Sequence, residues 1–195
     1  DTDRSRGLGD VYKRQILERE VPITEENPEK SKKGLYKIKD NYIRFWFAFV
    51  YPNMSFIESG NSSIVMKKIR SSLVSGHIAF VYEDVCRERM WELNGEDRWP
   101  FHFSKIGRWW DGKNEIDIAA IDPDGKNLIL GECKFWHEPV GVNIFNDLVE
   151  KSKSVTWKKA DRHTWYVLFS AEGFTDELKT LAQSRGDLLL FDDIN

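Results

Sequence analysis

The order of apolar and polar residues along the chain predicts a hairpin, then helices, then a run of strands and helices. Residues 16–39 hold two short alternating stretches around a polar, proline-containing loop, which predicts a β-hairpin. Asp40 precedes an aromatic segment of helical period, and Pro52 is expected to end that helix. Helical spacing of apolar residues continues over 61–93, with a break expected near Gly76.

Strands and helices alternate in the rest of the chain. Strands are predicted at 99–110, 114–121, 128–136, 163–171 and 187–192, and helices at 142–155 and 175–186. The first three strands are joined by turns and should form an antiparallel meander, whereas the later strands follow helices and should run parallel. The sequence therefore predicts an α/β fold with a mixed central sheet flanked by helices.

Charged residues interrupt two of these strands. NEIDIAAI (114–121) contains Asp117, and LILGECKFW (128–136) contains Glu132 and Lys134. Because strand side chains alternate between faces, Glu132 and Lys134 should share one face, and Cys133 should point to the other. Asp117 is close enough to share a site with Glu132 if the register allows, and alternation places Glu115 on the Asp117 face.

Buried charges of this kind require a partner, because an unpaired charge inside a sheet costs several kcal/mol. Two carboxylates without a neighbouring His or Cys suit a hard cation such as Mg²⁺. A lysine beside them could orient a water molecule and stabilise phosphate charge, which indicates phosphodiester hydrolysis. The alternative is a structural ion pair at the end of the sheet.

The order of these residues resembles the motif of the PD-(D/E)xK nuclease superfamily. Asp117 matches the family's aspartate, and the run from Glu132 to Lys134 matches its (D/E)-x-K element, although Ile116 stands where the motif has Pro. The resemblance implies a restriction-endonuclease-like core of order αβββαβ, here with an added helix and strand.

The same resemblance implies a role for each residue of the motif. Asp117, Glu132 and the Cys133 backbone carbonyl would bind Mg²⁺ or Mn²⁺, and Lys134 would position the attacking water. Glu83, in FVYEDVCRE, occupies the place of a glutamate on the first core helix. Glu83 would be an outer metal ligand or a structural residue. The catalytic residues would then be Asp117, Glu132, Lys134 and Glu83.

A closer resemblance covers residues 16–195. The run YKIKDNYIRFWFAFVYPN, with FVYEDVCRE, IGRWW, EIDIAAID and GECKFW, is similar to the C-terminal region, DUF234, of archaeal-type P-loop ATPases. It implies a P-loop ATPase domain in cis, then a winged helix whose wing is the hairpin at 16–39. The chain itself contains no G-x-x-x-x-G-K-[ST], so ATP hydrolysis is not expected of it.

The predicted organisation has three parts. Residues 1–15 lack an initiator Met and an apolar period, so they stay unassigned, as a fragment boundary or an artefactual tail. Residues 16–60 form the wing remnant and an aromatic linker helix, and residues 61–195 form the nuclease-like domain. The aromatic helix at 40–50 could also serve as a docking surface.

Composition narrows the expected partners. The net charge is −3, so contact with DNA would have to come from a local patch. A candidate patch, alternatively a solvated helix face, consists of Lys151, Lys153, Trp157, Lys158 and Lys159. Two cysteines without metal spacing favour a reducing cytoplasm, and no apolar run approaches the ~20 residues of a membrane-spanning helix.

The favoured hypothesis is a metal-dependent DNA endonuclease-like domain, a Mg²⁺-dependent deoxyribonuclease that forms the C-terminal part of an ATPase-linked protein. The alternative is a catalytically inactive nuclease-fold module that binds DNA or a partner and regulates an associated ATPase.

Overall fold

A computed structural model describes residues 16–96 and 98–192 and divides into two compact units. Of the described residues, the helical unit comprises Asn27–Ile78 with residues 16–21, and the sheet unit comprises Pro22–Glu26 with the chain from Ala79 to residue 192. The boundary predicted between residues 60 and 61 differs from this division, because the helix that begins at Ser62 contacts the preceding helix of the helical unit. The expectation for residues 1–15 lies outside the described residues.

The predicted hairpin is present at the start of the helical unit. Strands β1 (Leu17–Glu20) and β2 (Leu35–Ile38) pair antiparallel. A short 3-10 helix, η1 (Pro28–Lys30), lies in the loop between them. The Arg19 guanidinium closes this loop, since it donates hydrogen bonds to the carbonyls of Pro28 and Ser31.

The aromatic segment forms helices, but Pro52 does not end them. Its elements are α2 (Asn41–Phe45), the π-helix η2 (Trp46–Val50), the 3-10 helix η3 (Tyr51–Asn53) and α3 (Met54–Glu58). Asp40 caps the first helix as predicted, because its carboxylate accepts a hydrogen bond from the Ile43 amide. Pro52 stands in the first turn of a new helical segment, where its missing N–H is not needed.

The break expected near Gly76 is also absent. Helix α4 (Ser62–Leu73) passes into the π-helix η4 (Val74–Ile78) and then into α5 (Ala79–Gly95). A π-turn inserts one residue into a helix without interrupting it. Gly76 therefore marks a change of helical pitch at the end of the helical unit.

The sheet unit has the predicted order of elements. After α5 come β3 (Lys105–Trp110), β4 (Glu115–Ile121), β5 (Asn127–Lys134), α6 (Val142–Ser152), β6 (His163–Ser170), α7 (Asp176–Ser184) and β7 (Leu188–Phe191). The first of these strands begins later than predicted, because the buried Asn94 side chain bonds both backbone groups of Phe103 and holds that segment as a loop against α5.

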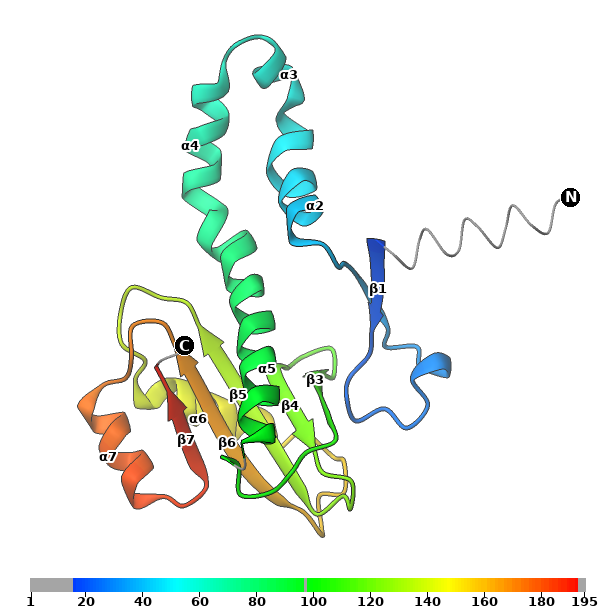
Figure 1. The fold of residues 1–195 in the computed structure, drawn as a ribbon, viewed down its shortest axis with the longest axis vertical. Coiled ribbons are helices and arrows are strands. Elements are labelled where there is room, and N and C mark those ends of the chain that lie inside the picture. Colours follow the sequence, from blue (N-terminus) through cyan, green and yellow to red (C-terminus); the bar gives the residue numbers. More distant parts are fainter. Residues whose placement is uncertain (1–15, 97, 193–195) are drawn as a thin grey trace, which may run out of the picture. The chain divides into compact units, whose positions relative to one another are not determined.

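The five strands form one mixed sheet of order β3-β4-β5-β6-β7. The first three pair antiparallel as a meander, and the last two pairings are parallel. The crossover helices α6 and α7 lie on one face and α5 lies on the other (Figure 1). This is the arrangement that right-handed parallel crossovers produce. The predicted α/β fold, with its order of strands and helices and its mixed sheet, is confirmed.

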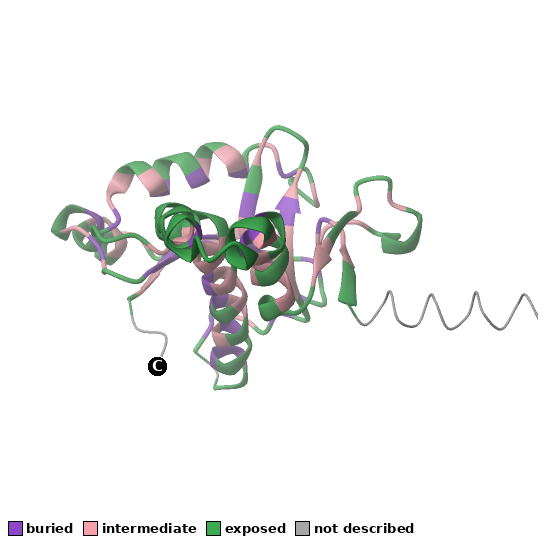
Figure 2. Cartoon of the chain, turned by 90° about the horizontal axis from the view of Figure 1, so that it is seen from above, coloured by how far each residue is buried: buried purple, intermediate pink, exposed green. Residues whose placement is uncertain are grey.

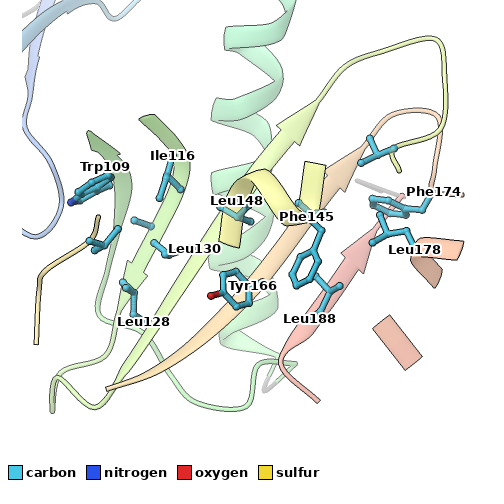
Figure 3. Close-up of a cluster of buried hydrophobic side chains, with 14 of the residues drawn as sticks. Trp109, Ile116, Leu128, Leu130, Phe145, Leu148, Tyr166, Phe174, Leu178 and Leu188 are labelled. Carbon is cyan, nitrogen blue, oxygen red and sulfur yellow. The ribbon is translucent and has the colours of Figure 1, made fainter. Parts of the chain in front are cut away.

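Two hydrophobic clusters hold these layers together. On the α6 side, Phe145 and Leu148 pack on Leu130 and Tyr166 of the strands (Figure 3). On the other side, α5 packs through residues such as Met90, which is fully buried. In Figure 2, buried residues occur in the strands and on the helices that pack against them. Within 16–96 and 98–192, no helix has both the length and the apolar character to cross a bilayer.

We expect Gly131→Ala to destabilise the sheet unit, because Gly131 lies on the central strand between Ile118 of β4 and Val167 of β6. An added Cβ would lie 2.4 Å from Val167 Cγ1 and 2.9 Å from the Val167 carbonyl oxygen. Overpacking of this kind costs about 1–3 kcal/mol, measured as the free energy of unfolding in urea. The control is Gly186→Ala, where nothing lies within 4 Å of the new Cβ. Equal stability of the two variants would contradict the prediction.

Candidate active site

The site lies where β4 and β5 part. Their pairing ends at the Ile118–Gly131 pair, while β5 continues beside β6 as far as Lys134. On its other edge β4 carries a bulge, because Gly107 pairs with Ala119 but Trp109 pairs with Ile116. The bulge adds one residue to β4 at Asp117. Bulges re-aim side chains in this way beside many functional sites.

Asp117 fills the gap between the parting strands. Its carboxylate accepts a hydrogen bond from the Cys133 amide at 3.0 Å, in place of the ladder bond that β4 no longer offers. The N–H and C=O of one residue in a strand point to the same edge. The Cys133 carbonyl is therefore directed toward β4, while the Lys134 carbonyl accepts from Ala171 on the β6 side.

Glu132 is the most buried charged group of the site, with 4% of its side chain exposed. Its Oε2 accepts a hydrogen bond from Lys134 Nζ at 2.6 Å, and its Oε1 accepts one from Lys151 Nζ at 2.6 Å. A buried carboxylate is tolerated only where such partners replace its lost hydration. Two lysines thus hold the two oxygens of one carboxylate.

Lys134 joins the two acids. Its Nζ also lies 3.8 Å from Asp117 Oδ2, so one ammonium group contacts both carboxylates. Burial by itself would lower the pKa of Lys134, but the charges of Glu132 and Asp117 hold that pKa above its ordinary value. Lys134 is therefore a cation here, and the structure brings together the three residues that alternation and order had grouped.

At Asp117, in contrast, the surroundings disfavour the charged form of the side chain. Burial raises the pKa of its carboxyl, and the negative charge of Glu132 raises it further. Lys134 and the Cys133 amide oppose this rise without cancelling it. Two acids that repel each other in a buried place are a common feature of sites that bind a cation.

Glu83 approaches the same region from α5. Its carboxylate lies 3.6 Å from Arg108 Nε and 3.8 Å from Arg87 Nη1. Arg87 also donates a hydrogen bond to the Asp117 carbonyl at 2.8 Å, so it connects α5 to the bulge. Burial first, and then the charge of Asp117, raise the pKa of Glu83 to about 7 despite these arginines.

Glu115 lies away from this group. Its carboxylate forms an ion pair with Arg108, on the side where Arg108 also contacts Glu83. The alternation argument for Glu115 was wrong, because the bulge at Asp117 reverses the faces of the residues that precede it on β4.

A pocket of about 490 Å³ opens between β5 and α6 at this place. Its wall includes Glu132, Lys134 and Lys151, together with Asn114, Trp136, Ile144, Asp147 and Glu150. The Lys134 ammonium lies 5.9 Å from the centre of the Trp136 ring. A ligand that entered the pocket would meet the buried carboxylate of Glu132, two ammonium groups and the exposed carboxylates of Asp147 and Glu150.

The structure separates the residues of the predicted lysine patch. Lys151 lines the pocket, whereas Lys153 is exposed and pairs with Glu150 at the rim of the pocket. Lys158 lies 5.8 Å from the Trp157 ring, which packs against the core beneath α6. The role of Lys151 beside Glu132 was missed, although its place three residues after the apolar Leu148 puts it on the sheet-facing side of the helix.

The donor set agrees chemically with a hard cation. Asp117, Glu132 and the Cys133 carbonyl offer oxygen atoms, which Mg²⁺ and Mn²⁺ prefer, and Mg²⁺ keeps several of its waters. Among residues 16–96 and 98–192, no group of three or more His, Cys, Asp or Glu side chains is placed to hold a metal ion. A cation would therefore rely on two carboxylates, and it would have to displace an ammonium from Glu132.

Comparisons with known proteins give the following relatives. Residues 46–153, more than half of the chain, match the family model DUF234, described as "Archaea bacterial proteins of unknown function". An uncharacterized protein of Methanocaldococcus jannaschii is 36% identical over 194 residues, 98% of this chain. The chain spans 41% of the length of that relative.

Two solved structures resemble part of the chain. A repair endonuclease from Pyrococcus abyssi is 16% identical, with a TM-score of 0.33 over 55% of this chain and 46% of the other. A protein of unknown function, AF1548, is 22% identical, with a TM-score of 0.33 over 56% of each chain.

The raised pKa of Glu83 predicts a pH dependence of stability in the metal-free protein. The folded protein keeps the Glu83 proton up to about pH 7, whereas the unfolded chain releases it near 4.5. Between these values the folded state binds more protons, so the free energy of unfolding falls as the pH rises. Glu83→Gln cannot ionise, so it should gain up to about 3 kcal/mol relative to the unchanged protein from pH 5 to pH 8.

Urea unfolding at the two pH values, in the presence of a chelator, measures this difference. The control is Glu172→Gln, an exposed acid after β6, whose difference from the unchanged protein should be the same at both pH values. A Glu83→Gln effect that does not change with pH would show that Glu83 is already ionised at pH 5.

Proposed function

We propose, from the premise that this chain belongs to the DUF234 family, that its sheet unit is a metal-dependent nuclease that hydrolyses phosphodiester bonds of DNA. One observation supports this above all: a single ammonium, that of Lys134, contacts the carboxylates of both Asp117 and Glu132 beside an open pocket. Two acids and a lysine in this order and geometry suit hydrolysis of a phosphate ester.

The side chains divide the work between them. Asp117, Glu132 and the Cys133 carbonyl would hold the cation, Mg²⁺ or Mn²⁺, with Glu83 as an outer ligand. Such a cation supplies a water of lowered pKa and a positive charge for the phosphate. Lys134, which the charges of two acids keep protonated despite its burial, would donate hydrogen bonds to the attacking water or to a phosphate oxygen.

Two cations beyond the end of α6 suit the DNA backbone. Lys153 follows Lys151 there, and Lys159 lies beside it, because its Nζ donates a hydrogen bond to the Lys153 carbonyl; Lys158 lies instead beside Gly125 in the turn between β4 and β5. Because the chain is acidic overall, DNA would be held here by this local set rather than by a general positive field. The DNA backbone would run past the C-terminal end of α6 and present one phosphate to the pocket.

The complete protein is a further part of this proposal. The relative from Methanocaldococcus jannaschii is more than twice as long as this chain. The resemblance to archaeal-type ATPases implies that a P-loop ATPase domain precedes the hairpin in cis. The nuclease would then work as the C-terminal part of an ATP-driven protein.

A second candidate is an inactive nuclease fold that binds DNA or a partner and regulates the ATPase. Two observations favour it. Both oxygens of Glu132 already have ammonium partners. The helical unit also exposes large aromatic side chains at the start of the DUF234 region, among them Phe47 at 51% and Tyr51 at 62% exposed, as a docking helix would.

We expect the purified chain to cleave supercoiled plasmid with Mg²⁺ or Mn²⁺ and not with a chelator. Asp117→Ala and Lys134→Ala should each lower the cleavage rate about 100-fold or more, since each removes a group at the reacting atoms. The matched controls are Asp124→Ala in the turn before β5 and Lys179→Ala on α7, both exposed and outside the pocket. They should cleave at the unchanged rate.

The outcomes separate the two candidates. Cleavage that survives both site variants would place the activity elsewhere. If the unchanged chain binds DNA in a gel-shift assay but never cleaves it, the inactive module is the better description. If it neither binds nor cleaves DNA, partner binding through the aromatic helix is the remaining function.

A further inference from the structure

Lys151 contacts the candidate metal ligand Glu132 from across the pocket. Its Nζ lies 2.6 Å from Glu132 Oε1, while Lys134 takes Oε2 at the same distance. The two lysines lie on different elements. Lys134 is on β5, two residues from Glu132, whereas Lys151 is on α6. One carboxylate therefore binds two cations of the protein before any metal is considered.

The second ammonium changes the charge of the site. Asp117 and Glu132 carry two negative charges, and Lys134 contacts both of them. Lys151 adds a second positive charge, so the four groups together are neutral. A neutral cluster attracts a divalent cation far less than a pair of acids with one lysine, because the attraction follows the net charge at short range.

Lys151 is also the partner that can leave. Its side chain is 31% exposed, against 20% for Lys134, and it lies in the wall of the pocket. A lysine ammonium at the end of a flexible four-carbon stem can turn into solvent without moving the backbone. The α6 backbone itself is held by the buried Phe145 and Leu148, so movement would be confined to the side chain.

We propose that Lys151 is an internal counter-ion that occupies the cation position on Glu132 until a divalent cation displaces it. The displaced ammonium stays in the pocket, where it meets the phosphate of the substrate. This inference rests on the proposed function and makes Lys151 a positioning residue that couples metal binding to phosphate binding. It also explains why a nuclease site is compatible with two ammonium groups on its metal ligand.

The test measures Mn²⁺ binding in the absence of DNA, by calorimetry or by the paramagnetic resonance of free Mn²⁺. Lys151→Met removes the competing charge, and we expect Mn²⁺ to bind about tenfold more tightly or better. Lys151→Gln keeps a hydrogen-bond donor for Oε1 without the charge, and it should also bind Mn²⁺ more tightly. The control, Lys179→Met on α7, should match the unchanged protein.

The variants distinguish a counter-ion from a structural hydrogen bond. If Lys151 only holds Glu132 in place, Lys151→Gln would bind Mn²⁺ as the unchanged protein does, and Lys151→Met would bind it more weakly. Either result overturns the proposal. Thermal melts by circular dichroism with a chelator identify a variant that does not fold, and the other Lys151 variant then decides.

The experiment also separates this inference from the nuclease proposal. If plasmid is cleaved with Mn²⁺ but neither Lys151 variant binds Mn²⁺ more tightly, the counter-ion role of Lys151 is rejected and the nuclease proposal is supported. If none of the proteins binds Mn²⁺, the metal-dependent nuclease falls as well. A second readout is the affinity for a short DNA duplex, which Mn²⁺ should raise in the unchanged protein and raise less in Lys151→Met.

Discussion

The burial of the Glu132 carboxylate in the middle of a sheet is the constraint on which the site depends. A carboxylate that is 4% exposed must find its charge partners inside the protein. Lys134 provides one because a strand returns to the same face every two residues, and Lys151 provides the other because α6 crosses above that face. The crossover helix is thus part of the site as well as of the core.

The position of Asp117 depends on a second constraint, the end of the pairing between β4 and β5. If the antiparallel ladder continued, the Cys133 amide would bond a backbone carbonyl. Because pairing ends at Gly131, that amide is available to the Asp117 carboxylate. The bulge on β4 supplies the extra residue that makes this contact possible. Two departures from regular sheet geometry, one on each edge of β4, therefore create one functional position.

These features explain what the sequence could predict and what it could not. The shared face of Glu132 and Lys134 was predictable because β5 is regular, and the order of elements followed from apolar periodicity and turns. The face of Glu115 was mispredicted because a bulge depends on pairing with β3, which periodicity does not contain. That the chain remains helical at Pro52 and Gly76 was not predicted, because short π and 3-10 turns leave no clear periodicity of apolar residues in the sequence.

The basic side chains that pair with the acids of the site also determine whether the site could bind a metal and act as an enzyme. Arg87 and Arg108 face Glu83, and Lys134 and Lys151 face Glu132, so both of these acids have basic neighbours. In the metal-free protein such a partner compensates the buried charge of the acid, and it also opposes the binding of a metal there. An active site therefore requires at least one pair that opens at low cost. The flexible side chain of Lys151, which is 31% exposed, meets that requirement better than Lys134, which two acids hold in place.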